Sequence, residues 1–139
     1  MLNEISGRSA FKILAVQPAA TPDQVQKLND YFGQCPPEYV DLIYKATEIE
    51  MQHSEGQYVR IWGPLGCIEM DKGYGIRQYM PSAFPIGDDG GGHIIFFAEG
   101  KHGYGLYYVG YGDLDLDDAI WIAPDLRTFL VNAEGIDTF

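Results

Sequence analysis

Residues 84–97 read FPIGDDGGGHIIFF, and this stretch says most about the fold. Two aspartates and three glycines lead into an uninterrupted apolar run, Ile94–Ala98. Glycine adopts positive φ without steric cost, so the glycines predict a tight turn at the entry to a strand. An apolar run without polar alternation predicts a strand that is buried on both faces, as in the middle of a sheet.

The sequence on either side of this stretch predicts further strands. Leu106–Val109 is a second apolar run, and residues 99–103 have the length and glycines of a hairpin loop between the two runs. Residues 58–62 alternate as a half-buried strand does, and residues 119–122 form a last short apolar run. Thirteen of the seventeen glycines lie between Gly63 and Gly112, which favours a tightly turned antiparallel sheet throughout that region.

Helical patterns lie before and after the predicted sheet. Thr21 and Gln24 bracket Pro22 as in a capping box, and apolar residues at helical spacing follow, so a helix is expected over 22–32. A second helix is expected over 37–46, after the turn forced by two prolines. Pro124 opens a final helix that ends at Gly135. The order of elements predicts an α+β fold, a largely antiparallel β-sheet with helices packed on one side.

Chain length and composition predict one folded domain over residues 1–139, of which residues 1–17 form an extended N-terminal segment. The first residues lack a basic region followed by an apolar stretch, and the longest apolar run is far too short to span a bilayer, so a cytoplasmic location is expected. Cys35 and Cys67 have no CxxC spacing and are expected to be reduced, partly buried thiols.

The formal net charge of −11 is concentrated in the second half of the chain. Residues 81–139 contain ten acidic side chains and two basic ones, Lys101 and Arg127. This charge repels phosphates, which disfavours nucleic acid and anionic membranes as partners, and it attracts a basic protein surface. High solubility alone would also explain an acidic composition.

Three groups of residues invite a chemical interpretation. The glycine-rich residues 87–92 lack the Lys-Ser/Thr of a phosphate-binding loop and carry two carboxylates, so a turn is the better interpretation. Residues 113–118 alternate aspartates like the start of a calcium loop, but the glycine and glutamate that an EF-hand requires are absent. A weak Ca²⁺ site stays open there, beside a solvated turn with Leu114 and Leu116 turned inward. The three histidines show neither metal-ligand nor triad spacing.

The remaining evidence is the order of short motifs along residues 18–131. They are Phe32-Gly33, Pro37-Glu38-Tyr39, Trp62-Gly63, Tyr74-Gly75-Ile76, Tyr79-Met80-Pro81, the FPIGDDGGGHIIFF stretch, and Ile122-Ala123 before Phe129-Leu130. This order resembles the SUKH superfamily, which includes the yeast Smi/Knr-type cell-wall regulators and many immunity proteins of bacterial polymorphic toxin systems. The glycine-rich stretch, with the family's IG-D-GGG pattern, is the most specific part of the resemblance.

The resemblance implies an α+β domain without catalytic residues or cofactors. It also implies a protein-binding role, in which an immunity protein neutralises a cognate toxin such as a nuclease or deaminase. A cytosolic adaptor or scaffold of the same fold, with no toxin partner, is the alternative. A third hypothesis, a small enzyme or metal-dependent factor, would use His93 with Asp88 and Asp89.

Aromatic and acidic residues of the second half are the candidates for contact with a basic partner, because tyrosine supplies contact area and carboxylates steer association. The candidate partner-binding residues are Asp88, Asp89, Tyr104, Tyr107, Tyr111, Asp113, Asp115, Asp117 and Asp118. No residue is assigned to catalysis or to a metal.

Overall fold

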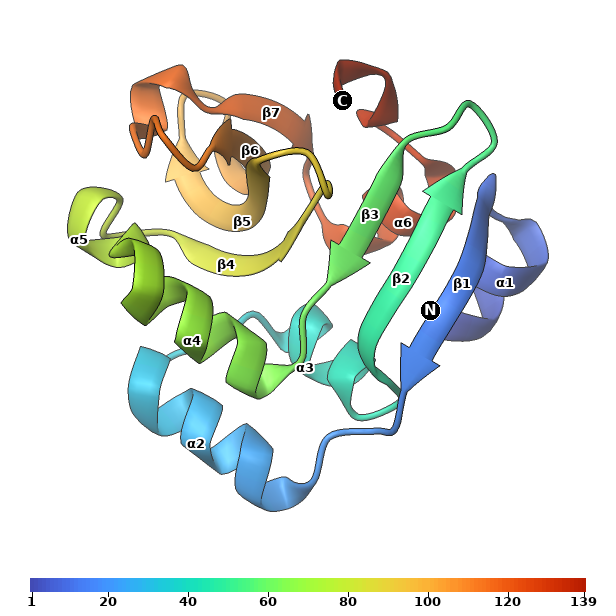
Figure 1. Ribbon diagram of the computed structural model, residues 1–139, viewed down its shortest axis with the longest axis horizontal. Coiled ribbons are helices and arrows are strands. Elements are labelled where there is room, and N and C mark those ends of the chain that lie inside the picture. Colours follow the sequence, from blue (N-terminus) through green and yellow to red (C-terminus); the bar gives the residue numbers. More distant parts are fainter.

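The computed structural model describes residues 1–139, apart from the side chains at positions 6 and 8, and over this range the chain forms one seven-stranded antiparallel sheet (Figure 1). Strands that follow each other in the chain are neighbours in the sheet, in the order β1 to β7. Their bounds are β1 Phe11–Gln17, β2 Thr47–His53, β3 Tyr58–Ile61, β4 Phe84–Asp88, β5 His93–Gly100, β6 Gly103–Gly110 and β7 Ile120–Ala123.

The helices complete an α+β fold, as the sequence predicts. Their bounds are α1 Leu2–Arg8, α2 Pro22–Phe32, α3 Pro37–Ile43, α4 Pro64–Tyr74, α5 Ile76–Tyr79 and α6 Leu126–Asn132, with short 3₁₀ turns at Leu116–Asp118 and Ile136–Thr138. In Figure 1, α3 and α6 lie behind the sheet and contact each other, while α2 packs beside α4. The predicted fold class is therefore confirmed.

The N-terminus of α2 forms as its sequence indicates. The Thr21 hydroxyl accepts a hydrogen bond from the Gln24 backbone N–H at 3.2 Å, and the Gln24 side chain accepts one from the Thr21 N–H at 3.0 Å. Two N–H groups that a helix start leaves unpaired are thus satisfied. The helix ends at Phe32, as predicted, and Gly33 takes a positive φ of 83°.

The second helix is shorter than predicted, because α3 ends at Ile43 rather than at residue 46. The chain turns there so that β2 can begin at Thr47. The predicted extended segment over residues 1–17 is extended in β1, which pairs with β2, and helical in α1.

The interpretation of the glycines between Gly63 and Gly75 as turns of a sheet is wrong, because α4 and α5 occupy this region. Gly63 precedes the helix, and a Cβ on Gly66 would lie 3.1 Å from the Trp62 Cβ, so a small residue lets the helix start close to the end of β3. Gly75 closes the helix with a φ of 64°. These glycines serve a helix and its ends.

The central hairpin agrees with the sequence in its main features. β5 and β6 both lie inside the sheet and are buried on both faces. Gly90 and Gly92 have positive φ, as a tight turn requires, but Gly87 and Asp88 belong to β4 rather than to the turn. The hairpin loop is also tighter than predicted, since Gly100 pairs with Gly103.

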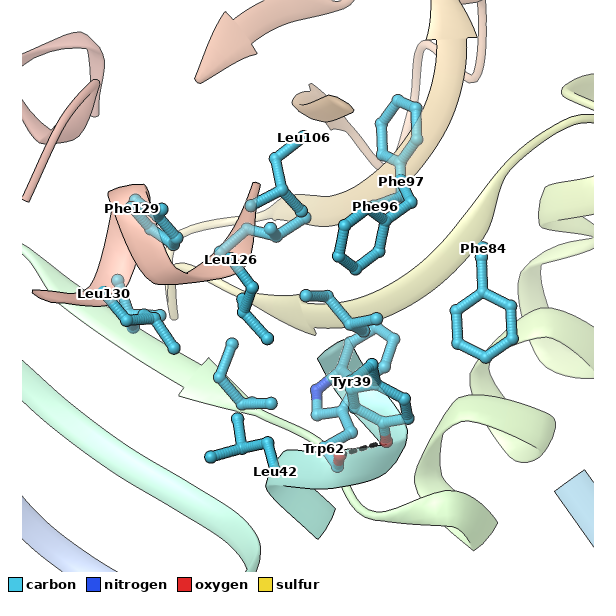
Figure 2. Close-up of a cluster of buried hydrophobic side chains, with 14 of the residues drawn as sticks. Tyr39, Leu42, Trp62, Phe84, Phe96, Phe97, Leu106, Leu126, Phe129 and Leu130 are labelled. Atoms are coloured by element: carbon cyan, nitrogen blue, oxygen red, sulfur yellow. Dashed lines mark hydrogen bonds between the residues drawn. The ribbon is translucent and has the colours of Figure 1, made fainter. Parts of the chain in front are cut away.

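A continuous apolar core joins the sheet to α3 and α6 (Figure 2). Leu126, Phe129 and Leu130 of α6 are fully buried. Tyr39 of α3 is also buried, and its hydroxyl donates to the Trp62 carbonyl oxygen at 2.5 Å. Among the described residues, no helix is long and apolar enough to cross a membrane.

The burial of α6 predicts the effect of truncating Leu130. Leu130→Ala should lower the free energy of unfolding by about 2–5 kcal/mol, because a cavity replaces packed side-chain atoms. Leu14→Ala, at a side chain that is 49% exposed, is the matched control and should cost far less. Chemical denaturation of both variants measures the difference, and equal losses would show that α6 is not a packed core element.

Candidate functional site

The acidic turn lies between β6 and β7. The Asp113 N–H donates to the Gly110 carbonyl oxygen at 3.0 Å, and the Asp115 carboxylate accepts from the Asp117 N–H at 2.9 Å. Leu114 and Leu116 pack against the core, as predicted, while all four aspartates of the turn are exposed. The fold therefore holds a set of carboxylates in the solvent on an ordered turn.

Three of these carboxylates gather closely. Oxygens of Asp113, Asp115 and Asp118 lie within 4.8 Å of one another. A hydrogen bond with Asp118 raises the pKa of the Asp113 carboxyl, which reflects the crowding of negative charge. Calcium takes about six to eight oxygen ligands, so three exposed carboxylates would be a partial set.

Tyr74 and Tyr79, which were not among the predicted contact residues, lie beside this turn together with Tyr111, which was. The rings of Tyr74 and Tyr111 lie 4.4 Å apart between centroids. Together with Tyr79, Gly112 and Leu114 they line a surface hollow of about 330 Å³. Tyr79 is 64% exposed and Tyr74 is 47% exposed. Tyr111 is thus one wall of an aromatic hollow rather than an isolated surface residue.

A single turn places Tyr74 and Tyr79. Gly75 is in the left-handed conformation, and its N–H donates to the Asp71 carbonyl oxygen at 2.8 Å, which ends α4 just after Tyr74. Because α5 starts at the next residue and is one turn long, its last residue, Tyr79, comes back to the same hollow. A Gly at this position is what the left-handed backbone favours.

Burial and charge both act on Tyr111. Burial raises the pKa of its phenol well above the usual value, and the negative charges of Asp88 and Asp89 raise it further. Its backbone N–H donates to the Gly92 carbonyl oxygen at 2.9 Å, which ties the acidic turn to the glycine-rich turn. The hollow therefore lies in a negative field to which Asp88 and Asp89 contribute.

Asp88 is a structural residue. Its carboxylate is buried and accepts hydrogen bonds from the Arg60 guanidinium at 2.9 Å, the Trp62 indole N–H at 2.7 Å and the Gly90 N–H at 2.9 Å. A carboxylate with these partners holds strands together and has little left to offer to a second protein. This placement corrects its interpretation as a contact residue.

Asp89 is nearer the surface and organises the glycine-rich turn. Its carboxylate accepts from the Gly91 N–H at 2.8 Å and the His93 N–H at 3.1 Å. Its other oxygen lies 3.0 Å from His93 Nδ1, so protonation of that ring would form an ion pair. The negative charge of Asp89 raises the pKa of Tyr111, so Asp89 acts on the hollow through its charge.

The structure separates the other two predicted tyrosines from the hollow. Tyr107 is fully buried. Its hydroxyl accepts from the His102 N–H and donates to the Gly103 carbonyl oxygen, so the side chain is held at the closed end of the β5–β6 hairpin. Its interpretation as a contact residue is wrong. Tyr104 is exposed, but it lines a different hollow with Phe97 and Pro36.

The three histidines lie apart in the described structure. Among the described residues, His93 and His102 lie at opposite ends of the β5–β6 hairpin, and His53 is buried in β2. Burial raises the pKa of the Cys67 thiol to about 12, which keeps it protonated and unreactive.

We use the name tyrosine–aspartate face for the surface that emerges from these observations. It consists of Tyr74, Tyr79, Tyr111, Leu114, Asp113, Asp115, Asp117 and Asp118. Comparison with known proteins adds no identification: no family model matches the chain, and no curated protein matches its sequence significantly.

The contrast between Asp88 and Asp89 generates a prediction. Asp88→Ala should lower the free energy of unfolding by about 2–4 kcal/mol, because it leaves the buried Trp62 N–H and the Arg60 side chain without their acceptor. Asp89→Ala should cost about 0.5–1.5 kcal/mol, since it removes hydrogen bonds at a partly exposed turn. Denaturant titrations compare the two, and a larger loss for Asp89→Ala would contradict the structural role of Asp88.

Proposed function

We propose that this chain is a cytosolic, non-catalytic protein-binding domain of the SUKH type, and that it neutralises a cognate toxin by covering the toxin's active surface. The observation that carries the proposal is the tyrosine–aspartate face, where three clustered tyrosines adjoin four exposed carboxylates. The order of motifs that resembles SUKH immunity proteins supports the same function.

The tyrosines suit a protein contact. A tyrosine ring supplies a large contact area at a low cost in side-chain entropy, and its hydroxyl still hydrogen-bonds at a wet interface. Tyr74 and Tyr79 hold this area in the solvent on a helix end and a one-turn helix, and the turn at Gly75 fixes their relative position. Such anchors are typical of the centre of an interface.

The aspartates favour a basic partner. Exposed charges at the rim of an interface act mainly on the rate of association and on the choice of partner. Enzymes that act on nucleic acids carry basic substrate grooves, because they must bind phosphates. An acidic, aromatic face would compete for such a groove, which is why a nuclease or deaminase toxin fits the proposal.

Co-expression tests the neutralising role. The product of a neighbouring gene that arrests bacterial growth should be tolerated when this chain is present, and the two purified proteins should form a complex. If substitutions in the tyrosine–aspartate face abolish tolerance of the toxic gene product, then neutralisation depends on the same contact as the complex. A complex that forms without any toxic activity to neutralise would instead favour the adaptor function.

Substitution of the acidic turn should slow association with the partner. Changing Asp113, Asp115, Asp117 and Asp118 together to asparagine should lower the association rate by about 10-fold or more at low salt, and should flatten its dependence on salt, because long-range attraction is lost. Surface plasmon resonance at two ionic strengths measures both quantities.

A charge-matched control separates steering by this face from the effect of net charge. Exposed acids elsewhere can be neutralised in the same number, with Asp23, Asp30, Asp41 and Glu134 changed to their amides. This variant has the same net charge as the first but keeps the acidic turn. If both variants slow association equally, the acidic turn is not part of the binding site.

A further inference from the structure

We infer that the hollow lined by Tyr74, Tyr79 and Tyr111 receives an arginine side chain of the partner protein. This inference rests on the proposed function, because it specifies which chemical group the tyrosine–aspartate face recognises. The hollow measures about 330 Å³, at the small end of the range of about 300–1,000 Å³ for ligand pockets. It therefore suits one side chain better than an extended segment of the partner.

The hollow offers aromatic rings in a negative environment. Cations are attracted to the faces of tyrosine rings, and this attraction grows when water is excluded. The acidic turn adjoins the hollow through Gly112 and Leu114. The C-terminus of α4, which ends at Tyr74, adds the partial negative charge of its last carbonyl groups. A cation is the ligand that these features have in common.

The chain itself contains a close precedent for this arrangement. The guanidinium of Arg77 lies 4.4 Å from the centre of the Phe32 ring and 5.0 Å from that of Tyr31, and its Nε lies 3.3 Å from an Asp71 carboxylate oxygen. Two rings and a carboxylate thus hold one arginine between α2 and α5. The tyrosine–aspartate face presents the same components on the surface.

The basic side chains that are close in sequence to the hollow are engaged elsewhere. Arg77 pairs with Asp71, and Lys72 lies 5.3 Å from the centre of the Tyr31 ring. The charge of Arg60 lowers the pKa of Tyr111, but Arg60 itself forms an ion pair with Asp88. In the part of the chain that the structure describes, the residues that line the hollow include no basic side chain. A cation for these rings has to come from another molecule.

Arginine fits better than lysine for two reasons. The guanidinium is planar and weakly hydrated, so it stacks on a ring at a smaller cost in lost hydration than an ammonium group. Its charge is also delocalised over the plane that stacks, so the cationic group lies directly on the face of the tyrosine ring. The lysine ammonium is compact and strongly hydrated, so its attraction to the acidic turn remains largely electrostatic.

Two short peptides test the choice of cation without the partner. One is a six-residue peptide of alternating glycine and arginine, and the other has lysine in place of arginine. In NMR titrations at low salt, the arginine peptide should bind about threefold to tenfold more tightly and should shift the ring resonances of Tyr74, Tyr79 and Tyr111. Equal affinities for the two peptides would overturn the inference.

Tyrosine variants connect this preference to the hollow. Tyr79→Leu should reduce the ratio of the two affinities to about one, whereas Tyr79→Phe, which keeps the ring, should retain most of it. Tyr104→Leu is the matched control, because Tyr104 is 52% exposed and lines another hollow. A preference that survives Tyr79→Leu, or that disappears in Tyr104→Leu, would place arginine recognition outside the hollow and overturn the inference.

The acidic turn should affect the two peptides alike. Changing its four aspartates to asparagine should weaken both peptides by similar factors and leave their ratio unchanged, because charge attracts both cations. Loss of the ratio in this variant would assign the preference to the carboxylates instead of the rings.

The growth test is independent of these results. Tolerance of a toxin without an arginine preference overturns the inference alone. An arginine preference without neutralisation of any toxin overturns the proposed function.

Discussion

The junction between β3 and β4 is the constraint on which the rest of the structure depends. Over the described residues, the register pairs of this junction are Arg60 with Asp88 and Ile61 with Gly87, the shortest ladder in the sheet. The Asp88 carboxylate adds bonds to Arg60 and Trp62 at the same place. A Cβ on Gly87 would overlap the Arg60 carbonyl oxygen, so glycine is needed for the strands to approach. The ion pair of Arg60 with the buried Asp88 carboxylate and the close approach at Gly87 thus compensate for little backbone pairing.

The same junction positions the tyrosine–aspartate face. The second oxygen of Asp88 holds the Gly90 N–H, and the turn that follows ends at Gly92, whose carbonyl oxygen accepts from Tyr111. Tyr111 in turn packs against Tyr74 at the end of α4. A chain of contacts therefore runs from the centre of the sheet to the surface. Residues that look like a ligand-binding loop in the sequence act here as the support of a surface formed by other elements.

Local patterns predicted the elements whose signals lie within a few residues. The capping box of α2 and the apolar runs of β5 and β6 are of this kind. β2 was missed although Ile49, Met51 and His53 are buried in strict alternation with polar residues, so its signal was present. α4 was missed because glycines interrupt its apolar pattern, while Gly63, Pro64 and Gly75 mark its two ends.

Tyr74 and Tyr79 could not be joined to the acidic turn from sequence, because only the tertiary fold brings α4, α5 and β6 together. Burial of Asp88 was not visible in the sequence, since aspartate usually reaches water, whereas Tyr107 lies in an apolar run whose pattern predicts burial.

Under the proposed function, the crowding of carboxylates on one turn serves binding rather than stability. Asp113 and Asp118 are close enough that the pKa of Asp113 is raised, which means that the folded chain opposes the full ionisation of this turn. The repulsion is small in water and does not stabilise the fold, while Leu114 and Leu116 pack the turn against the core. A cation from a partner would turn this mutual repulsion into attraction, and the effect would be largest where the neighbouring tyrosines exclude water. On this proposal the turn keeps a mild self-repulsion that a basic partner would relieve, and the free energy of that relief would add to binding.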